Sequence, residues 1–233
     1  QWDGLNERQQ AYVGFGQLLS TLPQDPTDIL VQGPRGDVYR LNTSTGAVSR
    51  AERGSDRFQS VVADLNGEIR GREEFILEGG QAYFGIQLKD PTTGQWAEHF
   101  RWSARDREPV SIVGFTNDPN TVLIQSTQGR DHAAIYEYNI STRQMGEPAF
   151  AHPFFDATGV IRSRGPAHYG EILGFSYGAE RGRVYWLDSN LEQAEATLRA
   201  ALGVQTESIS WVDIASGQRG RFTTGDGADI EIT

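Results

Sequence analysis

Residues 38–48 read VYRLNTSTGAV, an aromatic and aliphatic run that ends at Asn42 and continues through a turn into a second run. The pattern of such a run ending at Asn or Asp recurs three more times along the chain. The other copies are GIQLKD at 85–90, IYEYN at 135–139 and VYWLD at 184–188. Their last residues follow one another at intervals of 48 or 49 residues. A regular period of this length predicts a repeat architecture.

A second motif supports the repeat. Residues 25–32, DPTDILVQ, and 118–125, DPNTVLIQ, both place Asp-Pro before an apolar run. Asp-Pro predicts a turn, because proline presets φ and aspartate bonds the following backbone, and the apolar run then reads as a buried strand. Units of about 40–50 residues with four short strands are typical of propeller blades. We therefore predict an all-β fold, a β-propeller segment of about four to five blades. A β-sandwich with evenly spaced turns is the alternative.

The period divides the chain into five blade-like repeats, at residues 1–48, 49–101, 102–148, 149–203 and 204–233. A fifth copy of the first motif, WVDIASGQ, surrounds Asp213. Residues 189–202, SNLEQAEATLRAAL, instead carry apolar residues on one helical face, and Asp188 or Ser189 can cap their start. The sequence thus predicts one short helix near residues 189–202, between two blades.

Composition excludes several classes of function. The 233 residues carry 21 basic and 31 acidic side chains, a net charge of −10, with no basic cluster, which argues against nucleic-acid binding. The absence of cysteine excludes disulfides, thiolate metal sites and thiol catalysis. No apolar stretch is long enough for a membrane span, and the four histidines lack the spacing of a zinc site. We expect no cofactor, no metal, no nucleic-acid partner and no membrane partner.

Residues 174–178 read GFSYG and match the G-x-S-x-G pattern of serine hydrolases. In those enzymes the serine lies on a strained turn between a strand and a helix, and the histidine follows later in the chain. Here the motif leads into a polar turn and then a strand-like aromatic run, and the last histidine, His168, precedes it. The pattern predicts that Ser176 is a strand residue in a hairpin and not a nucleophile.

Several segments resemble, in the same order, parts of the propellers of the prolyl oligopeptidase family of serine peptidases, in the branch of dipeptidyl aminopeptidases and acylaminoacyl peptidases. They are LLSTLPQDPTDILVQ at 18–32, SVVADLNGEIRGREEF at 60–75, GFTNDPNTVLIQSTQGRDHAAIYEYN at 114–139 and LGFSYGAERGRVYWLDSN at 173–190. The resemblance covers about residues 18–203. It implies an N-terminal propeller joined to a C-terminal α/β-hydrolase domain that carries a Ser-Asp-His triad. No position of this chain matches a member of that triad.

The resemblance implies a non-catalytic function for this chain, which would gate substrate access to a hydrolase domain that the chain does not include. The implied partners are the α/β-hydrolase domain of the same parent protein and the parent's peptide substrate. The alternative is a self-contained propeller that acts as a protein- or ligand-binding module. Five complete repeats would suffice to close a small ring, whereas the propellers of the family are larger.

Two residue pairs are candidates for substrate binding. Glu73 and Glu74, in GREEF, are similar to the paired glutamates with which some members of the family hold a substrate's amino terminus, although adjacent strand residues point to opposite faces. Arg130 and Asp131, in QGRDHAAIY, are expected to shape a turn between two strands, through an ion pair or an Asx-type bond, and offer a second contact for substrate. No catalytic residue is expected in this chain.

Overall fold

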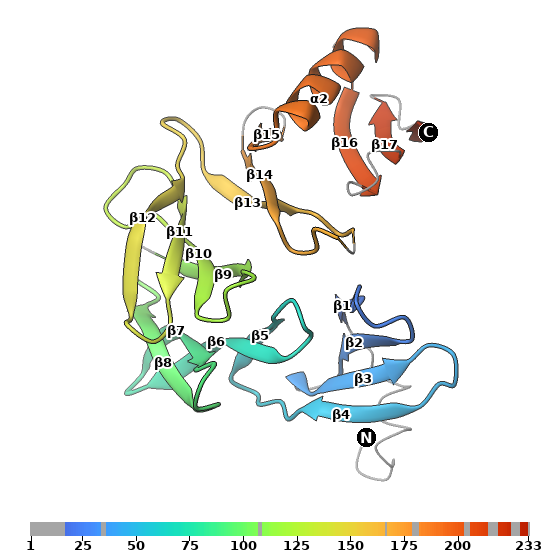
Figure 1. The fold of residues 1–233 in the computed structure, drawn as a ribbon. Helices are drawn as coiled ribbons and strands as arrows, with labels where there is room; N and C mark the ends of the chain where they lie inside the picture. The colour runs from blue at the N-terminus through green and yellow to red at the C-terminus, as the bar shows by residue number, and fades with distance from the viewer. Residues whose placement is uncertain are drawn as a thin grey trace. The chain divides into compact units, whose positions relative to one another are not determined.

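The structure is a computed structural model. It describes residues 17–33, 36–106, 109–165, 167–178, 182–202, 206–213, 219–224 and 229–232. Figure 1 draws the strands and the helix described below. The chain divides into two compact units. The first unit comprises residues 1–126 and 137–147, and the second comprises residues 127–136 and 148–233.

Each sheet of the described part is an antiparallel meander in which strands pair in chain order. The first sheet contains β1 (Gln17–Ser20), β2 (Asp28–Gln32), β3 (Val38–Asn42) and β4 (Val48–Glu52). The second contains β5 (Phe58–Ala63), β6 (Ile69–Glu78), β7 (Gln81–Lys89) and β8 (Trp96–Ser103). The third contains β9 (Val110–Phe115), β10 (Thr121–Ser126), β11 (Ala134–Asn139) and β12 (Gln144–Phe150).

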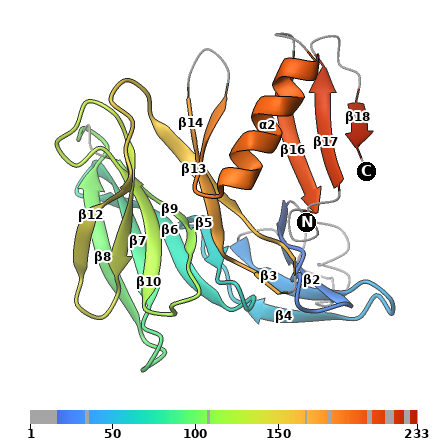
Figure 2. The same cartoon turned by 45° about the horizontal axis from the view of Figure 1, so that its top comes forward.

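Two further sheets have three strands each. One contains β13 (Ala157–Arg162), β14 (Ile172–Tyr177) and β15 (Arg183–Trp186), and the other contains β16 (Thr206–Asp213), β17 (Arg219–Thr224) and β18 (Asp229–Ile232). Helix α2 (Ser189–Leu202) connects them and lies beside β16 (Figure 2). The described part is therefore all-β, with propeller-like sheets and one short helix, as predicted. No described helix is long and apolar enough to cross a membrane.

In the first unit, the first strand of one sheet contacts the first strand of the next. Strand β5 contacts both β1 and β9. Between the first two sheets lies an apolar core of five buried side chains, Leu22, Leu30, Val38, Val61 and Ile69. Glu52 of β4 and Arg72 of β6 form an ion pair at 2.5 Å that also joins these sheets. Contact between consecutive first strands is the packing expected of neighbouring propeller blades.

The repeat found in the sequence corresponds to the third strand of each sheet. Tyr39 lies on β3, Tyr136 on β11 and Tyr185 on β15, and each of these is the third strand in its sheet, as predicted. The fifth copy is a wrong prediction, because Asp213 ends β16, the first strand of its sheet. The strands that pair with a strand decide its place in a sheet, and the short match around Asp213 carries no information about those partners.

Each repeat ends in the same side-chain contact. The Oδ1 atom of Asn42 accepts hydrogen bonds from the backbone N–H groups of Ser44 and Thr45 at 3.2 and 2.9 Å. Equivalent bonds to the residues two or three positions ahead are made by Asp90, Asn139 and Asp188. The recurring Asn or Asp is thus the residue that binds the backbone directly after each of these third strands, where the chain turns back or, after Asp188, enters α2.

Candidate functional site

Glu73 and Glu74 lie in the first unit, on β6, and their carboxylates point to opposite faces of the sheet. Glu73 accepts hydrogen bonds from the Ser60 hydroxyl at 2.7 Å and from the Ile112 backbone N–H at 2.9 Å. Glu74 is 5 % exposed and accepts a bond from Gln87 Nε2 at 3.0 Å. The two carboxylates therefore do not converge on one point, and each has a structural partner. Glu73 in particular joins the second sheet to β9.

Arg130 and Asp131 lie in the second unit, on the turn between β10 and β11, and both are exposed. The backbone N–H of Arg130 donates to the carbonyl oxygen of Thr127 at 2.8 Å, which closes the turn. The two candidate pairs therefore belong to different units, and the structure does not assign them to one site.

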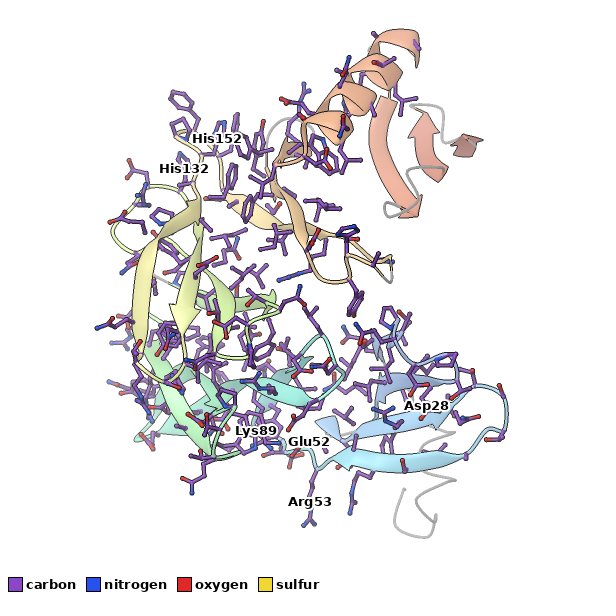
Figure 3. The ribbon with its side chains drawn as sticks, viewed as in Figure 1. Asp28, Glu52, Arg53, Lys89, His132 and His152 are labelled. Carbon is purple, nitrogen blue, oxygen red and sulfur yellow. The ribbon has the colours of Figure 1, made fainter. Side chains whose placement is uncertain are left out.

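The β10–β11 turn is fastened to the connection between β12 and β13. Asp156 Oδ1 accepts a hydrogen bond from the Ala133 backbone N–H at 2.7 Å and lies 3.6 Å from His132 Nδ1. The backbone N–H of Ala157 donates to the carbonyl oxygen of Ala133 at 2.8 Å. Figure 3 labels His132 and His152 where these two segments meet. Both ends of the connection are held, because His152 Nδ1 also accepts the Phe154 backbone N–H at 3.2 Å.

Four rings gather at this junction, and we call them the aromatic platform: His152, Phe154, Phe155 and Tyr177. The His152 ring stacks on the Tyr177 ring with centroids 4.6 Å apart and planes 13° apart. Phe155 lies 5.0 Å from His152 and 6.3 Å from Tyr177, and Phe154 lies 6.3 Å from His152. Three rings come from the β12–β13 connection and one from the end of β14. Contacts of this kind between rings hold their relative orientation.

A second group of rings, which includes the buried Phe150 and Phe175, adjoins the platform at Tyr177. Phe150, at the end of β12, is buried and lies 5.8 Å from the Tyr177 ring. It also stacks on Phe175 at 5.2 Å with planes 3° apart, and on Tyr185 at 5.4 Å. Contact with the buried Phe150 ring limits the movement of Tyr177, on which His152 stacks, so this part of the platform is preorganised.

Large exposed rings occur on this surface and on the edge strand of the sheet beside it. Phe154 is 72 % exposed and Phe155 is 37 % exposed. Tyr185, on the edge strand of the same sheet, is 54 % exposed, whereas its equivalents Tyr39 and Tyr136 are 2 % and 3 % exposed. Large contiguous exposed rings are unfavourable in water and mark binding surfaces.

The polar groups on the segments that carry or adjoin the platform include two exposed carboxylates, the exposed guanidinium of Arg130 and the ring N–H of His152. His152 uses Nδ1 as an acceptor, so its ring proton is on Nε2. The exposed carboxylates of Asp131 and Asp156 lie on the two segments that carry or adjoin the rings. This arrangement suits apolar and cationic groups, which contact ring faces and are attracted by nearby carboxylates. In the described part, no group of three or more His, Asp or Glu side chains is placed to hold a metal ion.

The sequence pattern pointed to Arg130 and Asp131, beside the platform, but missed the platform itself. The signal available was HPFF at 152–155, two consecutive phenylalanines outside any alternating strand pattern. Buried strands account for most phenylalanines in an all-β chain, so a Phe-Phe pair after His-Pro in a connection is unusual.

A cleft in the first unit is the other candidate site. Its volume is about 330 Å³, and Arg40, Glu52, Glu68 and Lys89 are among its lining residues. Figure 3 labels Glu52 and Lys89. Lys89 pairs with Glu68 at 2.5 Å, and Arg40 pairs with Asp25 at 2.9 Å. These cations are neutralised by neighbours in the same unit, so the cleft does not attract a charged ligand strongly.

Comparison with solved structures finds distant similarities. TolB from Acinetobacter baumannii aligns with a TM-score of 0.47 and 14 % identity over 90 % of this chain and 52 % of its own. A protein named as a TolB from Agrobacterium tumefaciens aligns with a TM-score of 0.44 and 12 % identity over 91 % and 78 %. An uncharacterized protein from Listeria monocytogenes aligns with a TM-score of 0.40 and 12 % identity over 94 % and 66 %.

This chain thus spans about half the length of the Acinetobacter protein. No family model and no curated protein matches the sequence. The propeller-like architecture is therefore assigned from the sheets and contacts of this chain itself.

Proposed function

We propose that this chain is a non-catalytic, propeller-like binding domain that recognises a segment of a partner protein through the aromatic platform. The observation that carries the proposal is the exposure of Phe154. Its side chain is 72 % exposed, although hydrogen bonds hold the β12–β13 connection at Asp156 and at His152. Exposed aromatic rings in a rigid setting are the side chains that dominate the binding energy of protein interfaces. The net charge of −10 and the adjacent carboxylates favour a segment with apolar and basic side chains.

A peptide-display selection tests this proposal. A random peptide library is selected on the wild-type chain, and individual peptides are then measured against two variants. Phe154→Ser removes the exposed ring, and Leu77→Ser is the matched control, because Leu77 is 71 % exposed on the β6–β7 hairpin of the first unit. Phe154→Ser is expected to weaken binding about 10-fold or more, since truncating a central aromatic residue costs more than about 1.4 kcal/mol. Leu77→Ser is expected to leave it unchanged.

The selected peptides are expected to be rich in basic and apolar residues. The proposal fails if no peptide binds the wild-type chain, or if the Phe154 and Leu77 variants bind the selected peptides equally well. Acidic peptides that bind at the same surface would support recognition by the platform and contradict the expected charge of the partner.

The sequence resemblance supports a second candidate, gating of substrate access in a serine peptidase of the prolyl oligopeptidase family. Ser176 lies within β14, opposite Gly159 and Val184, and its hydroxyl bonds to the Thr158 hydroxyl at 3.1 Å. Ser176 thus lies on a hairpin strand, as predicted, and this position fits a non-catalytic role for the chain. The nucleophile of such a peptidase would therefore lie outside these residues.

Fluorophosphonate labelling tests the peptidase candidate. The chain itself, and its Ser176→Ala variant, are expected to show no labelling. Labelling of the native protein that contains this chain, at a serine outside it, would support the gating role. Labelling at Ser176 would contradict the proposed non-catalytic function.

A further inference from the structure

Arg162 is a cation without a matching anion. It is the last residue of β13, and its Nη1 donates to the carbonyl oxygen of Gly170 at 3.0 Å. Its Nη2 is buried and has no hydrogen-bond partner. Among the described residues, no carboxylate forms an ion pair with this guanidinium. A buried donor left unpaired is costly, and more so when the group is charged.

The equivalent positions in two other sheets are apolar. The residue after the first strand donates its backbone N–H across the following loop in each case: Asp64 to Glu68, Thr116 to Thr121 and Ser163 to Glu171. The preceding residue is Ala63 in the second sheet and Phe115 in the third, but Arg162 in the fourth. The first-strand position therefore does not require a cation, and Arg162 is a special feature of the fourth sheet.

The loop that holds Arg162 is also distinctive. It runs from Ser163 to Glu171, whereas the equivalent loop of the second sheet runs only from Asp64 to Glu68. The longer loop provides Gly170, whose carbonyl oxygen holds the guanidinium. The insertion and the cation therefore occur together.

The described part of the loop beside Arg162 carries one further arginine and one carboxylate that is paired with a histidine. Arg164 is exposed in the same loop, and Glu171 lies 3.2 Å from His168 in an exposed pair. Burial lowers the pKa of the Arg162 guanidinium below its ordinary value, and the nearby Tyr169 hydroxyl opposes this shift. The Ser163 hydroxyl is also buried without a partner. Two buried donors without acceptors thus lie next to each other in sequence.

We propose that Arg162 forms an oxyanion-binding site at the β13–β14 loop, which takes a carboxylate or phosphate group. The free Nη2 donates a charge-assisted hydrogen bond to the oxyanion, and Gly170 keeps the guanidinium in position. An anion would compensate the partly buried charge and satisfy the unpaired donor. The site is independent of the aromatic platform, because none of its residues contributes a ring to it.

Thermal unfolding of the whole chain in inorganic phosphate tests this site, with potassium chloride at equal ionic strength as the reference. At a phosphate concentration about ten times the dissociation constant, the melting temperature is expected to rise by about 3–5 °C above the chloride reference. Arg162→Met is expected to abolish this rise. Arg183→Met, which removes the same charge from an exposed position on β15, is expected to retain it.

Acetate replaces phosphate in a second series and separates the two sources of the oxyanion. Saturable stabilisation by phosphate alone identifies a phosphate ligand, and stabilisation by both identifies a general oxyanion site. If Arg162→Met does not fold, Arg162→Lys serves instead, with an expected weakening of phosphate binding, because an ammonium group lacks the planar donor fork. The proposal is wrong if neither anion stabilises the wild-type chain, or if the Arg162 variant responds to phosphate as the wild type does.

Discussion

The backbone angle φ of one residue differs between the three Asn or Asp turns that lead into a fourth strand and the turn that leads into helix α2. The fourth residues after Asn42, Asp90 and Asn139 are Gly46, Gly94 and Arg143, with φ values of 69°, 69° and 57°. Positive φ ends the turn and returns the chain as the fourth strand of the sheet. The fourth residue after Asp188 is Glu192, which stays helical, and the chain continues as α2. Glycine adopts positive φ at little cost and occupies this position in two of the three hairpins, whereas Arg143 adopts it in the third.

Substitution of Gly94 is therefore expected to destabilise the protein. A Cβ atom at this position would meet only the Lys89 side chain, at 4.0 Å, so the cost of Gly94→Ala is one of backbone conformation and not of collision. We expect a loss of about 1 kcal/mol in the free energy of unfolding, measured by urea denaturation.

Gly182→Ala is the control for this experiment. A Cβ atom at Gly182 would meet nothing within 4 Å, and the residue does not adopt positive φ. The expected change is within about 0.5 kcal/mol of the wild type. Equal unfolding midpoints for both variants would show that positive φ at Gly94 does not matter to stability.

At the scale of the elements, helix α2 depends on its first turn. Asp188 Oδ1 accepts the backbone N–H groups of Asn190 and Leu191 at 2.8 and 3.3 Å, which makes Asp188 and not Ser189 the capping residue. Trp186 donates its indole N–H to Glu195 and so attaches the helix to β15. A single Asx contact thus serves as a hairpin turn in three repeats and as a helix cap in the fourth.

Removal of this cap is expected to weaken the helix. Asp188→Ala should lower the free energy of unfolding by about 1 kcal/mol, because two backbone donors of the first turn lose their acceptor. Asp188→Asn retains an acceptor oxygen and is expected to lose less. Ser189→Ala, one residue later, is the control and should stay near the wild type. A larger loss for Ser189→Ala than for Asp188→Ala would reverse the assignment of the cap.

His99, which bonds to a side chain of the next sheet, is expected to make the free energy of unfolding depend on pH. His99, on β8, bonds to the Tyr138 hydroxyl of β11 at 2.9 Å, and the two rings meet edge to face. Burial lowers the pKa of His99 from 6.5 to about 4, helped by Arg143 and opposed by Asp90. The unfolded chain therefore binds a proton between about pH 6.5 and pH 4, where the folded chain does not. This histidine destabilises the folded state as the pH falls through that window.

The variant His99→Gln is expected to reduce this pH dependence. Urea unfolding of both proteins at pH 7 and pH 5 isolates the contribution of His99, because the other titrating groups are common to both. The wild type should lose more stability than the variant between these two values. Equal losses would mean that His99 titrates normally in the folded protein.

At the scale of the whole molecule, electrostatic repulsion between copies of the chain opposes their association through the exposed rings. The net charge of −10 keeps copies of the chain apart when the screening length is long. The aromatic platform is an apolar patch made of several side chains in contact with one another, and such patches favour association.

Salt is therefore expected to promote self-association through the platform. Raising the salt concentration from about 0.01 M to about 1 M shortens the screening length from about 30 Å to about 3 Å. Light scattering at high protein concentration should show a rise in mean mass for the wild type and for Leu77→Ser. The rise should be smaller for Phe154→Ser. Association that is identical in all three proteins would locate the contact elsewhere on the chain.

Local interactions explain which features were predictable from the sequence. The turn at Asn42, the helix after Asp188 and the strand character of Ser176 all depend on residues within a few positions of each other in the chain. Asx bonds, helix caps and alternating strand patterns act over that range, so a short stretch of sequence is enough to determine them. The period of 48 or 49 residues then extended these local signals to the succession of sheets.

Tertiary pairing decided the rest. Asp213 matches the repeat in composition but ends a first strand, because strand order depends on partners elsewhere in the chain. The aromatic platform unites the β12–β13 connection with Tyr177 at the end of β14, and Asp156 fastens it to the β10–β11 turn. The buried Nη2 of Arg162 lacks an acceptor because of the segments packed around it, which its position in the sequence does not reveal. Exposure and hydrogen-bond satisfaction are properties of the surroundings of a side chain, and those surroundings are set by contacts between segments far apart in sequence.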